Sequence, residues 1–359
     1  MPASDRPNTS GRHLSPQVNR DRRIAVFGAS GHTGCFVVSE LQRRGIRPIL
    51  AGRDEQKLKT FSSTCGALDV RVASVEDASS LDRALEGASL VINCAGPFLD
   101  TAAPVIEAAL RARIHYLDVT AEQAVTLTEF ERFSGAACAA GVLIVPSMAF
   151  YGGLGDMLAT AAMGDWPTAD EIRIAVALDS WQPTLGTRLT GQRNTSRRLV
   201  FSGNRLTHVA DSPPRQPWNF PLPFGTEDVV PLPLAETILM SRHLQAPEIH
   251  SYMNLKPLAE LHDPAVPSPT AADETGRSAQ QFLMDVVVRR GAEKRHAMAA
   301  GRDIYATTAP LVVEAAEGVL SGGKRSCGTV APGELFDTTN FLQALSSQHF
   351  HCELEVGSS

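Results

Sequence analysis

The stretch Ile24-Ala25-Val26-Phe27-Gly28-Ala29-Ser30-Gly31-His32-Thr33-Gly34 decides the fold of this 359-residue chain. A short apolar run enters a turn with three spaced glycines, and a helix-compatible sequence follows, which is the context of a dinucleotide-binding turn. Gly28 allows the tight exit from the strand, Gly31 lets the backbone approach a pyrophosphate, and Gly34 lets the helix pack closely on the sheet. We therefore predict that this turn binds phosphate groups.

The helix that begins after this turn adds to the phosphate site. Its first N–H groups and the positive end of its dipole face the phosphates. The hydroxyls of Ser30 and Thr33 can assist, and His32 either touches a phosphate or is an exposed residue at the start of the helix. The turn is thus expected to contribute Gly28, Ser30, Gly31, His32, Thr33 and Gly34 to cofactor binding.

An alternation of short apolar strands and helical stretches continues downstream of the turn. Strands are predicted at residues 24–27, 48–51, 70–73, 90–93, 115–118 and 142–145. Helices are predicted at residues 37–44, 55–61, 78–85, 102–112 and 122–140. Buried strands joined by helices form a parallel sheet covered on both faces. The fold class is therefore α/β, with a Rossmann-type doubly wound parallel sheet.

The pattern changes after about Tyr151, where longer and more polar strands are predicted at residues 171–178, 199–209 and 280–289. A proline-rich passage at 213–233 and a helix at 305–320 complete a second, α+β domain, and a turn with a short helix follows at 333–345. We expect a flexible tail at 1–20, a Rossmann domain at 21–150, and a substrate and dimerisation domain at 151–332. Residues 333–359 are a candidate to pack back onto the first domain.

Composition narrows the range of partners. The net charge is −6 and the sequence pI is about 5.9, so no basic surplus is available for nucleic acid or an anionic membrane. The six cysteines form no C-x-x-C pair, which predicts neither a zinc site nor any other metal site. No signal peptide or membrane-spanning run is expected. A cytoplasmic homodimer with a small-molecule substrate is the expectation.

Arg53 decides between the two nicotinamide cofactors. It follows the second strand about 20 residues past the glycine turn, where an NAD-binding protein would place an acidic residue for the ribose hydroxyls. A guanidinium can pair with a 2′-phosphate and stack on adenine, so NADP(H) is favoured. Asp54 follows immediately, and the alternative is that Arg53 is a solvated residue at a helix start.

Several segments in order resemble the saccharopine dehydrogenase-like family of NADP-binding oxidoreductases. The matching segments are Gly28 to Gly34, Ala51-Gly52-Arg53 with Lys57-Leu58, Val91-Ile92-Asn93-Cys94-Ala95-Gly96-Pro97-Phe98 and His115-Tyr116-Leu117-Asp118-Val119-Thr120-Ala121-Glu122. The resemblance implies a Rossmann domain beside a substrate domain, with nicotinamide and substrate in the cleft between them. The family includes amino-acid dehydrogenases and enoyl reductases, so the fold alone does not select a substrate.

The sequence departs from the family pattern after the sixth strand. Many members have G-F-D-S-x-P-x-D, whereas this chain reads Ala149-Phe150-Tyr151-Gly152-Gly153-Leu154-Gly155-Asp156. Tyr151 stands at the position of the first Asp and Gly152 at that of the Ser, while Asp156 is retained. A role that the family gives to the missing Asp and Ser cannot be transferred.

Three loops at the carboxyl ends of strands are expected to face the nicotinamide. They contribute the cofactor-binding candidates Cys94, Ala95, Gly96, Pro97, Phe98, Val119 and Ser147. Hydride transfer needs a donor where negative charge develops, and Tyr151 is the leading catalytic candidate. The alternative is a tyrosine that packs in the interdomain hinge. Asp118 and Glu122 are further catalytic candidates, although the first can simply hold loop backbone and the second can cap a helix.

The second domain offers an arginine cluster for a carboxylate or phosphate of the substrate, consisting of Arg188, Arg193, Arg197 and Arg198. Such clusters are commonly solvated faces. Taken together, the sequence predicts an NADP(H)-dependent oxidoreductase that acts on a C=N, C=O or C=C bond. One alternative is a redox sensor that binds NADP(H) without turnover. Another is a trans-acting enoyl reductase, for which the apolar passage from Trp218 to Leu234 would cover a channel for an acyl chain.

Overall fold

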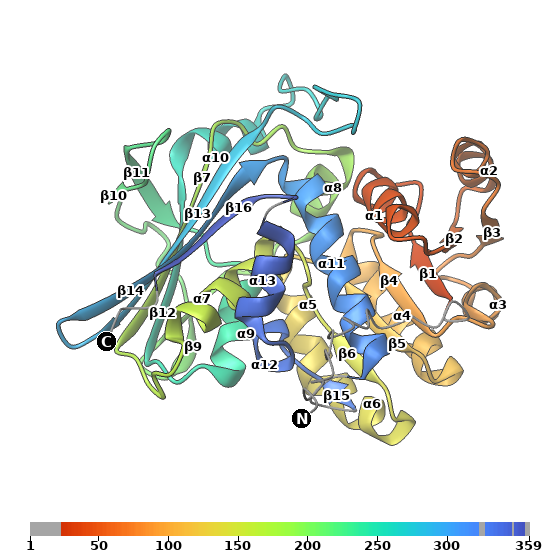
Figure 1. The fold of residues 1–359 in the computed structure, drawn as a ribbon, viewed down its shortest axis with the longest axis horizontal. Helices are drawn as coiled ribbons and strands as arrows, with labels where there is room; N and C mark the ends of the chain where they lie inside the picture. Colours follow the sequence, from red (N-terminus) through yellow and green to blue (C-terminus); the bar gives the residue numbers. More distant parts are fainter. Residues whose placement is uncertain (1–22, 323–326, 347, 356–359) are drawn as a thin grey trace, which may run out of the picture.

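The computed structural model describes residues 23–322, 327–346 and 348–355. The tail predicted at 1–20 lies outside these residues. Two sheets dominate the described chain, and Figure 1 shows them side by side with the helix α11 (Ile304–Ser321) between them. The predicted combination of a doubly wound parallel sheet with a second, mixed domain is confirmed.

The first sheet has seven strands in the order β15-β6-β5-β4-β1-β2-β3, and every neighbouring pair is parallel. Six of them match the predicted strands: β1 (Ile24–Phe27), β2 (Ile49–Gly52), β3 (Asp69–Val72), β4 (Leu90–Asn93), β5 (His115–Asp118) and β6 (Leu143–Val145). The strand order reverses between β1 and β4, so a ligand crevice is expected at their carboxyl ends. The seventh strand, β15 (Gly328–Thr329), was not predicted.

Helices cover both faces of this sheet because its central strands β1, β2 and β4 are buried along their whole length, whereas the edge strand β3 is partly exposed. One face packs on α1 and α11, and the other packs on α3, α4 and α6. The helices of the domain are α1 (His32–Arg43), α2 (Glu55–Thr64), α3 (Ala78–Leu85), α4 (Phe98–Ala112), α5 (Gln123–Thr128) and α6 (Ser134–Ala140). The single helix predicted at 122–140 is divided by the π-helical turn η1 (Glu129–Phe133), so that prediction needed correction.

The second sheet has nine strands, and its main path runs β10-β11-β12-β7-β13-β14-β16. These strands are β7 (Glu171–Leu178), β10 (Gln216–Asn219), β11 (Thr226–Pro231), β12 (Glu248–Asn254), β13 (Gln281–Arg290), β14 (Glu293–Arg302) and β16 (His351–Glu355). The single strand predicted at 199–209 is wrong. It folds into the hairpin β8 (Leu199–Ser202) and β9 (Arg205–His208), because Gly203 and Asn204 both adopt positive φ, as a tight hairpin turn requires.

One face of the second sheet turns towards the first domain and carries α7 (Gly155–Met163) and α9 (Ala235–His243). Two shorter helices, α8 (Leu185–Arg193) and α10 (Leu255–His262), lie at the carboxyl end of β7 and after β12. Nearly every residue of α7 is buried, because the helix packs between the second sheet, α9 and α13. The two domains therefore share a core rather than being joined by a linker alone.

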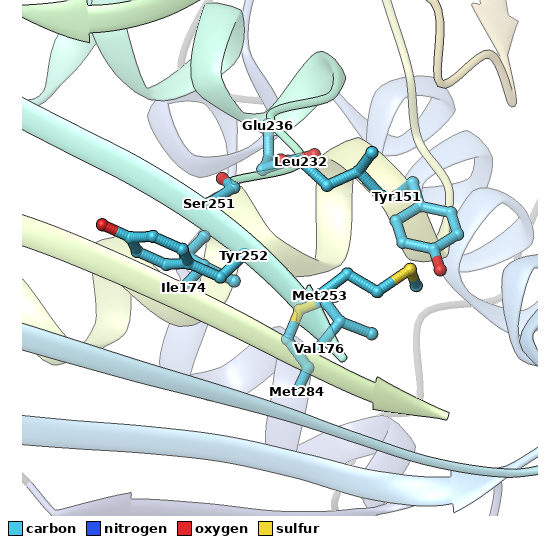
Figure 2. Close-up of a pocket in the computed structure, with 9 residues that line it drawn as sticks. All are labelled: Tyr151, Ile174, Val176, Leu232, Glu236, Ser251, Tyr252, Met253 and Met284. Carbon is cyan, nitrogen blue, oxygen red and sulfur yellow. The ribbon is translucent and has the colours of Figure 1, made fainter. Parts of the chain in front are cut away.

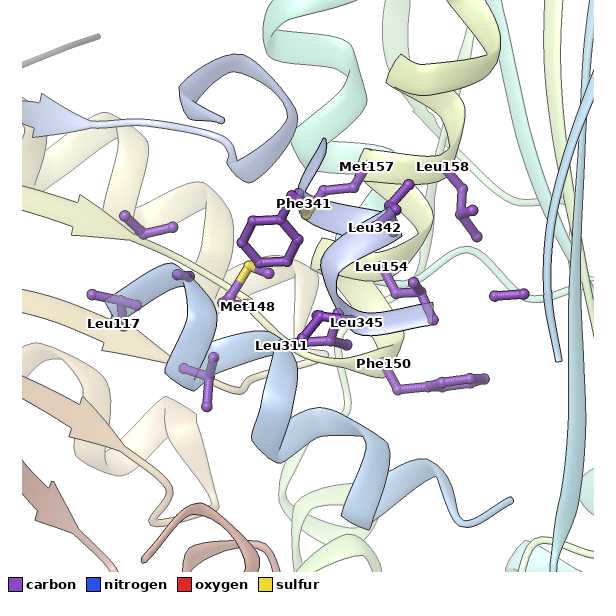
Figure 3. Close-up of a cluster of buried hydrophobic side chains, with 14 of the residues drawn as sticks. Leu117, Met148, Phe150, Leu154, Met157, Leu158, Leu311, Phe341, Leu342 and Leu345 are labelled. Carbon is purple, nitrogen blue, oxygen red and sulfur yellow. The ribbon is translucent and has the colours of Figure 1, made fainter. Parts of the chain in front are cut away.

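The closing segment of the chain contributes to both domains. β15 extends the first sheet and β16 extends the second, while α12 (Pro332–Leu335) and α13 (Thr338–Ser346) pack on α7. Figure 3 shows Phe341, Leu342 and Leu345 of α13 meeting residues of α7 and α11 in this shared core. β15 joins the first sheet at residues 328–329, which lie within the range predicted for the second domain. The segment expected to return to the first domain instead packs on α7 through α12 and α13 and extends the second sheet through β16.

Candidate active site

The glycine turn has the geometry that a phosphate cradle requires. Gly28 adopts φ +83°, and a Cβ there would lie 2.8 Å from the backbone nitrogen of Ala95. A Cβ on Gly34 would overlap the carbonyl oxygen of Gly28. Gly31 is the N-cap of α1, and no side chain of the described residues caps that helix end. The first N–H groups of α1 are therefore open to an anion, which fits a dinucleotide pyrophosphate.

Arg53 lies exposed at the end of β2, and among the described residues it forms no ion pair within 4 Å. Its acidic neighbour Asp54 is engaged as the N-cap of α2, where its carboxylate accepts the N–H of Lys57 at 3.0 Å. Lys57 and Lys59 each pair with an acidic residue of this helix start. Near the end of β2, Arg53 is therefore the cationic side chain without an acidic partner among the described residues, and it is available to bind a 2′-phosphate.

The loop after β4 is held in place by Asn93, the last residue of that strand, which is fully buried. Its amide oxygen accepts the N–H of Ala95 at 3.0 Å, and its amide nitrogen donates to the hydroxyls of Thr101 and Tyr116. The Thr101 hydroxyl in turn donates to the carbonyl of Ala95 at 2.5 Å. This network fixes Cys94 to Phe98 in place. Sequence reasoning did not single out Asn93, although a polar residue that ends a buried strand is a usable signal.

Asp118 joins the loops that follow β5 and β6. It is fully buried, and its carboxylate accepts the N–H groups of Thr120 and Ser147 and the hydroxyl of Tyr116 at 2.8 to 3.0 Å. The hydroxyl of Ser147 lies 2.8 Å from that of Thr126. Because these groups already have partners, the geometry favours a positioning role for Asp118 and Ser147 rather than direct contact with substrate or cofactor.

A second buried carboxyl group accompanies Asp118. Burial, together with the neighbouring Asp118 carboxylate, raises the pKa of Glu129 well above its ordinary range. The folded protein therefore favours the neutral form of the Glu129 carboxyl group.

Glu122 caps α4 across the loop. One of its carboxylate oxygens accepts the N–H of Phe98 at 2.8 Å, and the other oxygen has no hydrogen-bond partner among the described residues. Burial raises the pKa of Glu122 to about 7, and the nearby Asp118 carboxylate adds to this. Glu122 stands at the N-cap position of α5, but its side chain makes no capping hydrogen bond to that helix, so the alternative that it caps the helix following it is wrong. Its free oxygen and its pKa keep it a candidate for proton transfer.

Tyr151 lies in the kinked turn η2 (Phe150–Leu154), directly after the loop that contains Ser147. Its hydroxyl is buried and has no hydrogen-bond partner among the described residues. Its ring packs on Phe150 and Trp181, with centroids 4.9 and 5.7 Å apart. Burial, with smaller contributions from Tyr305 and Glu236, raises the pKa of Tyr151 well above its ordinary range, so the phenol keeps its proton.

A small pocket of about 10 Å³ lies between Tyr151 and the second sheet, which is room for a single water. Figure 2 shows Tyr151 at one end near Met253, with Leu232, Glu236 and Ser251 along one side. The remaining lining residues are Ile174, Val176, Tyr252 and Met284. The walls are mainly apolar. The ionisable residues that line the pocket are Glu236 and the tyrosines Tyr151 and Tyr252.

Glu236 was not recognised in the sequence. It is 4% exposed, and one carboxylate oxygen accepts the N–H of Leu234 at 2.9 Å. Burial raises its pKa. Nothing in the sequence around Glu236 separates it from an ordinary acidic residue in the first turn of a helix, because its burial depends on the packing of α9 against η2 and Gly155.

The helix α8 bridges the two domains over the loop after β4. A Cβ on Gly96 would lie 3.1 Å from the hydroxyl of Thr190, so α8 approaches this loop closely. The hydroxyl of Thr187 lies 2.9 Å from that of Tyr305 in α11. The Tyr305 ring also meets His32 of the phosphate turn edge-on, with centroids 5.3 Å apart. Tyr305 therefore lies between α8 and the phosphate turn, and the sequence did not single out Thr187 or Thr190.

The four arginines predicted to receive a substrate anion do not act as one cluster. Arg188 donates to two backbone carbonyls, Arg193 pairs with Asp100, and Arg197 pairs with Asp211. Arg198 makes no ion pair within 4 Å to any described residue, and it lies close enough to Glu236 and Tyr151 for electrostatic interaction. Only Arg198 therefore stays a candidate for substrate binding.

The proline-rich passage does not cover the pocket. Trp218 of β10 packs on Ala175 and Ala177 of β7, whereas the pocket is lined by Ile174 and Val176 of the same strand. Because alternate residues of a strand face opposite sides of a sheet, Trp218 lies on the face away from the cleft. Leu232 alone brings this passage to the pocket.

Comparisons with known proteins identify the first domain. Residues 24–145 match the model of the saccharopine dehydrogenase NADP binding domain. The saccharopine dehydrogenase-like oxidoreductases of Bos taurus and Homo sapiens are 29% and 30% identical over 152 and 153 residues, which is 36% of this chain and 35% of each relative. A trans-acting enoyl reductase of Mycobacterium ulcerans is 26% identical over 139 residues, covering 37% of this chain and 33% of the relative.

Over its whole length the chain resembles the solved apo saccharopine dehydrogenase (L-Glu forming) of Saccharomyces cerevisiae. The TM-score is 0.66 at 10% identity, and the match covers 93% of this chain and 99% of that one. At this identity the likeness concerns the fold.

The class of protein is thus a two-domain, nicotinamide dinucleotide-binding fold. More specifically, residues 24–145 match the saccharopine dehydrogenase NADP binding domain, which agrees with the resemblance seen in the sequence and confirms the prediction of a nicotinamide cofactor. Its sequence matches span about a third of the length of the curated relatives. In the part of the chain that the structure describes, no helix is long and apolar enough to cross a membrane.

Proposed function

We propose that this protein is an NADP(H)-dependent oxidoreductase that transfers hydride between the nicotinamide and a small organic substrate with a C=N, C=O or C=C bond. The observation that carries the proposal is the Tyr151 hydroxyl, which is buried, keeps its proton and has no hydrogen-bond partner among the described residues, in the turn that follows the loop after β6. A buried donor without a partner is costly unless a ligand uses it.

In this proposal the bound cofactor supplies or accepts the hydride, and the protein's own residues do the rest. Gly28, Gly31 and Gly34, with Ser30, His32 and Thr33, form the pyrophosphate turn, and Arg53 binds the 2′-phosphate. The loop from Cys94 to Phe98, together with Val119, contacts the nicotinamide half. Tyr151 donates to the substrate atom on which negative charge develops, and Glu122 exchanges the proton with solvent. Asp118 and Ser147 hold the loops.

A second candidate, a trans-acting enoyl reductase, is supported by the similarity to the trans-acting enoyl reductase of Mycobacterium ulcerans, which is 26% identical over 139 residues. It shares the Tyr151 donor and differs in the substrate, an α,β-unsaturated acyl thioester. The expected homodimeric state and cytoplasmic location remain predictions, and sedimentation and localisation of the tagged full chain would test them.

The test is a titration of the full chain with NADPH, followed by assays of NADPH oxidation with matched imines, aldehydes, ketones and enoyl thioesters. We expect tight NADPH binding and oxidation with one of these classes. Consumption of the enoyl thioester alone would select the second candidate. Binding without oxidation by any class would contradict both proposals and favour the redox-sensor alternative.

A further inference from the structure

Two cysteines from distant parts of the sequence meet at the edge of the first sheet. The Sγ atoms of Cys138 in α6 and Cys327, which directly precedes β15, lie 2.7 Å apart. Both residues are thiols in the structure, and both reach the surface, Cys138 as an exposed residue and Cys327 as a partly exposed one. An S–S bond measures about 2.05 Å, so a small side-chain movement would bring the two sulfurs to bonding distance.

The other cysteines are less suited to thiol chemistry. Burial raises the pKa of the Cys35 and Cys352 thiols to about 11, and burial raises that of Cys94 further still. Because the thiolate is the reactive form, these three react slowly near neutral pH. Cys65 lies near enough to Cys35 for their charges to interact, so this pair is the competing cross-link that an experiment must separate.

The strand that a Cys138–Cys327 bond would secure is weakly held by its own pairing. β15 has two residues and pairs with β6 alone, through the N–H of Gly328 to the carbonyl of Val142 and the N–H of Val330 to that of Ile144. The chain then enters α12, where the N–H of Gly333 donates to Asp156 at 2.7 Å. A bond at Cys327 therefore secures the start of the segment that connects the two domains.

We propose that Cys138 and Cys327 form a reversible disulfide under oxidising conditions and that this bond fastens β15 to α6. The oxidant is a small-molecule disulfide such as oxidised glutathione. One protein thiolate attacks it and releases one glutathione thiolate; the second protein thiolate attacks the mixed disulfide and releases the other. The protein thiols lose two protons and two electrons, and both electrons pass to the glutathione.

The bond has a large expected effect on stability because it joins residues 189 positions apart. Cross-linking removes conformational freedom from the unfolded chain, more so for long loops. Oxidation is therefore expected to raise the midpoint of thermal unfolding by about 5 °C, and a dithiol reductant should reverse the change. The inference is independent of the proposed hydride transfer.

The experiment treats the full chain with oxidised glutathione, blocks the remaining thiols with N-ethylmaleimide, and maps the peptides by mass spectrometry without reduction. We expect a linked peptide pair that contains Cys138 and Cys327. The rise in the unfolding midpoint should disappear in both Cys138→Ser and Cys327→Ser, and it should persist in the matched control Cys65→Ser. Two variants are used so that a folding defect in one does not decide the result.

Three outcomes would overturn the proposal. The first is alkylation of both Cys138 and Cys327 after oxidation, with no linked peptide between them. The second is a linked peptide in a wild-type protein whose unfolding midpoint is unchanged by oxidation. The third is a link between Cys35 and Cys65 that accounts for the rise in the unfolding midpoint. In that case the rise would be lost in Cys65→Ser and kept in Cys138→Ser.

Discussion

Arg193 of α8 and Asp100 of α4 tie the second domain to the first. The guanidinium donates to both carboxylate oxygens at 2.9 to 3.2 Å. One helical turn earlier in α8, Thr190 lies over Gly96 in the loop expected to face the nicotinamide. The ion pair therefore holds α8 across the place where the nicotinamide half of the cofactor is expected, and α8 itself contains no buried residue that would hold it there.

The first prediction concerns this ion pair. Arg193→Ala should accelerate NADPH dissociation and raise its Kd by about two- to fivefold, because an ion pair this exposed contributes modestly. Stopped-flow fluorescence of bound NADPH measures both quantities. Arg197→Ala is the matched control, since Arg197 pairs with Asp211 on the surface and should leave the Kd unchanged. An equal effect of the two variants would argue against a role for α8 in cofactor retention.

The second prediction concerns the choice of cofactor. Arg53→Ala should weaken NADPH binding roughly 10- to 100-fold, the usual loss for charge-assisted hydrogen bonds, and should leave NADH binding unchanged. Calorimetric titration of both cofactors provides the comparison. Lys57→Ala is the control, because Lys57 already pairs with Asp54. A preference for NADPH that survives Arg53→Ala would remove Arg53 from the site.

The sequence could predict much of the first domain because its signals are local. Neighbouring residues are enough to predict the glycine turn at Gly28 to Gly34 and the six strands. The observed ends of these strands differ from the predicted ends by no more than one residue. β15 escaped prediction because a two-residue strand has no periodicity of its own. It forms because residues 328–329 pair with the unpaired edge of β6, which lies far away in the sequence.

The candidate site divides in the same way. Tyr151 and Glu122 were found because they follow predicted strands, whereas Glu236 and Thr190 reach the cleft from elements whose packing no local pattern encodes. For the carboxylate of Asp118 the sequence predicts the position of the residue but not all of its hydrogen-bond partners. One of the partners that occupy it, the N–H of Ser147, comes from another loop.

The third prediction tests the donor. Tyr151→Phe should lower kcat roughly 100-fold with the substrate class found active and should leave the Kd for NADPH unchanged, because the hydroxyl acts on the substrate alone. Single-turnover oxidation of NADPH measures the step itself. Tyr252→Phe is the matched control, since Tyr252 lines the far end of the same pocket. Unchanged turnover in Tyr151→Phe would support the hinge-packing alternative.

The fourth prediction uses the pKa of Glu122, which burial raises from 4.5 to about 7. Because the folded state favours the protonated carboxyl, the stabilisation it provides is fully present below pH 4.5 and is lost as the pH rises through 7. The free energy of unfolding of the wild type relative to Glu122→Gln should therefore fall by about 3 kcal/mol over that interval. Urea unfolding of the two proteins without cofactor measures this difference.

The control for this prediction is Glu107→Gln, whose carboxylate forms an exposed pair with Arg132. Measured over the same interval, it gives the difference from the wild type that the loss of an exposed carboxylate produces by itself. A difference for Glu122→Gln that does not fall with pH relative to this control would mean that the Glu122 carboxyl is not held protonated, and it would remove the basis for its role in proton exchange.

The fifth prediction concerns the pair that holds the closing segment. Nε2 of His243 lies 2.7 Å from Oδ1 of the fully buried Asp156, and the other oxygen of Asp156 accepts the N–H of Gly333. Burial lowers the pKa of His243, but the Asp156 carboxylate outweighs it and the net shift is upward. The imidazolium is thus favoured in the folded state, and α12 is held to α7 and α9 through one carboxylate.

His243→Gln should therefore cost on the order of 2 kcal/mol of stability below pH 6.5, because it leaves Asp156 buried with one partner fewer. Since the pKa of His243 is raised in the folded state, this stabilisation is present below pH 6.5 and fades as the pH rises through the folded pKa. The cost of the substitution should shrink over the same range, as denaturant unfolding at a series of pH values can measure.

His250→Gln removes a histidine from the more exposed pair with Glu248 and should have a smaller effect. A cost for His243→Gln that stays constant with pH would mean that the histidine acts by packing alone.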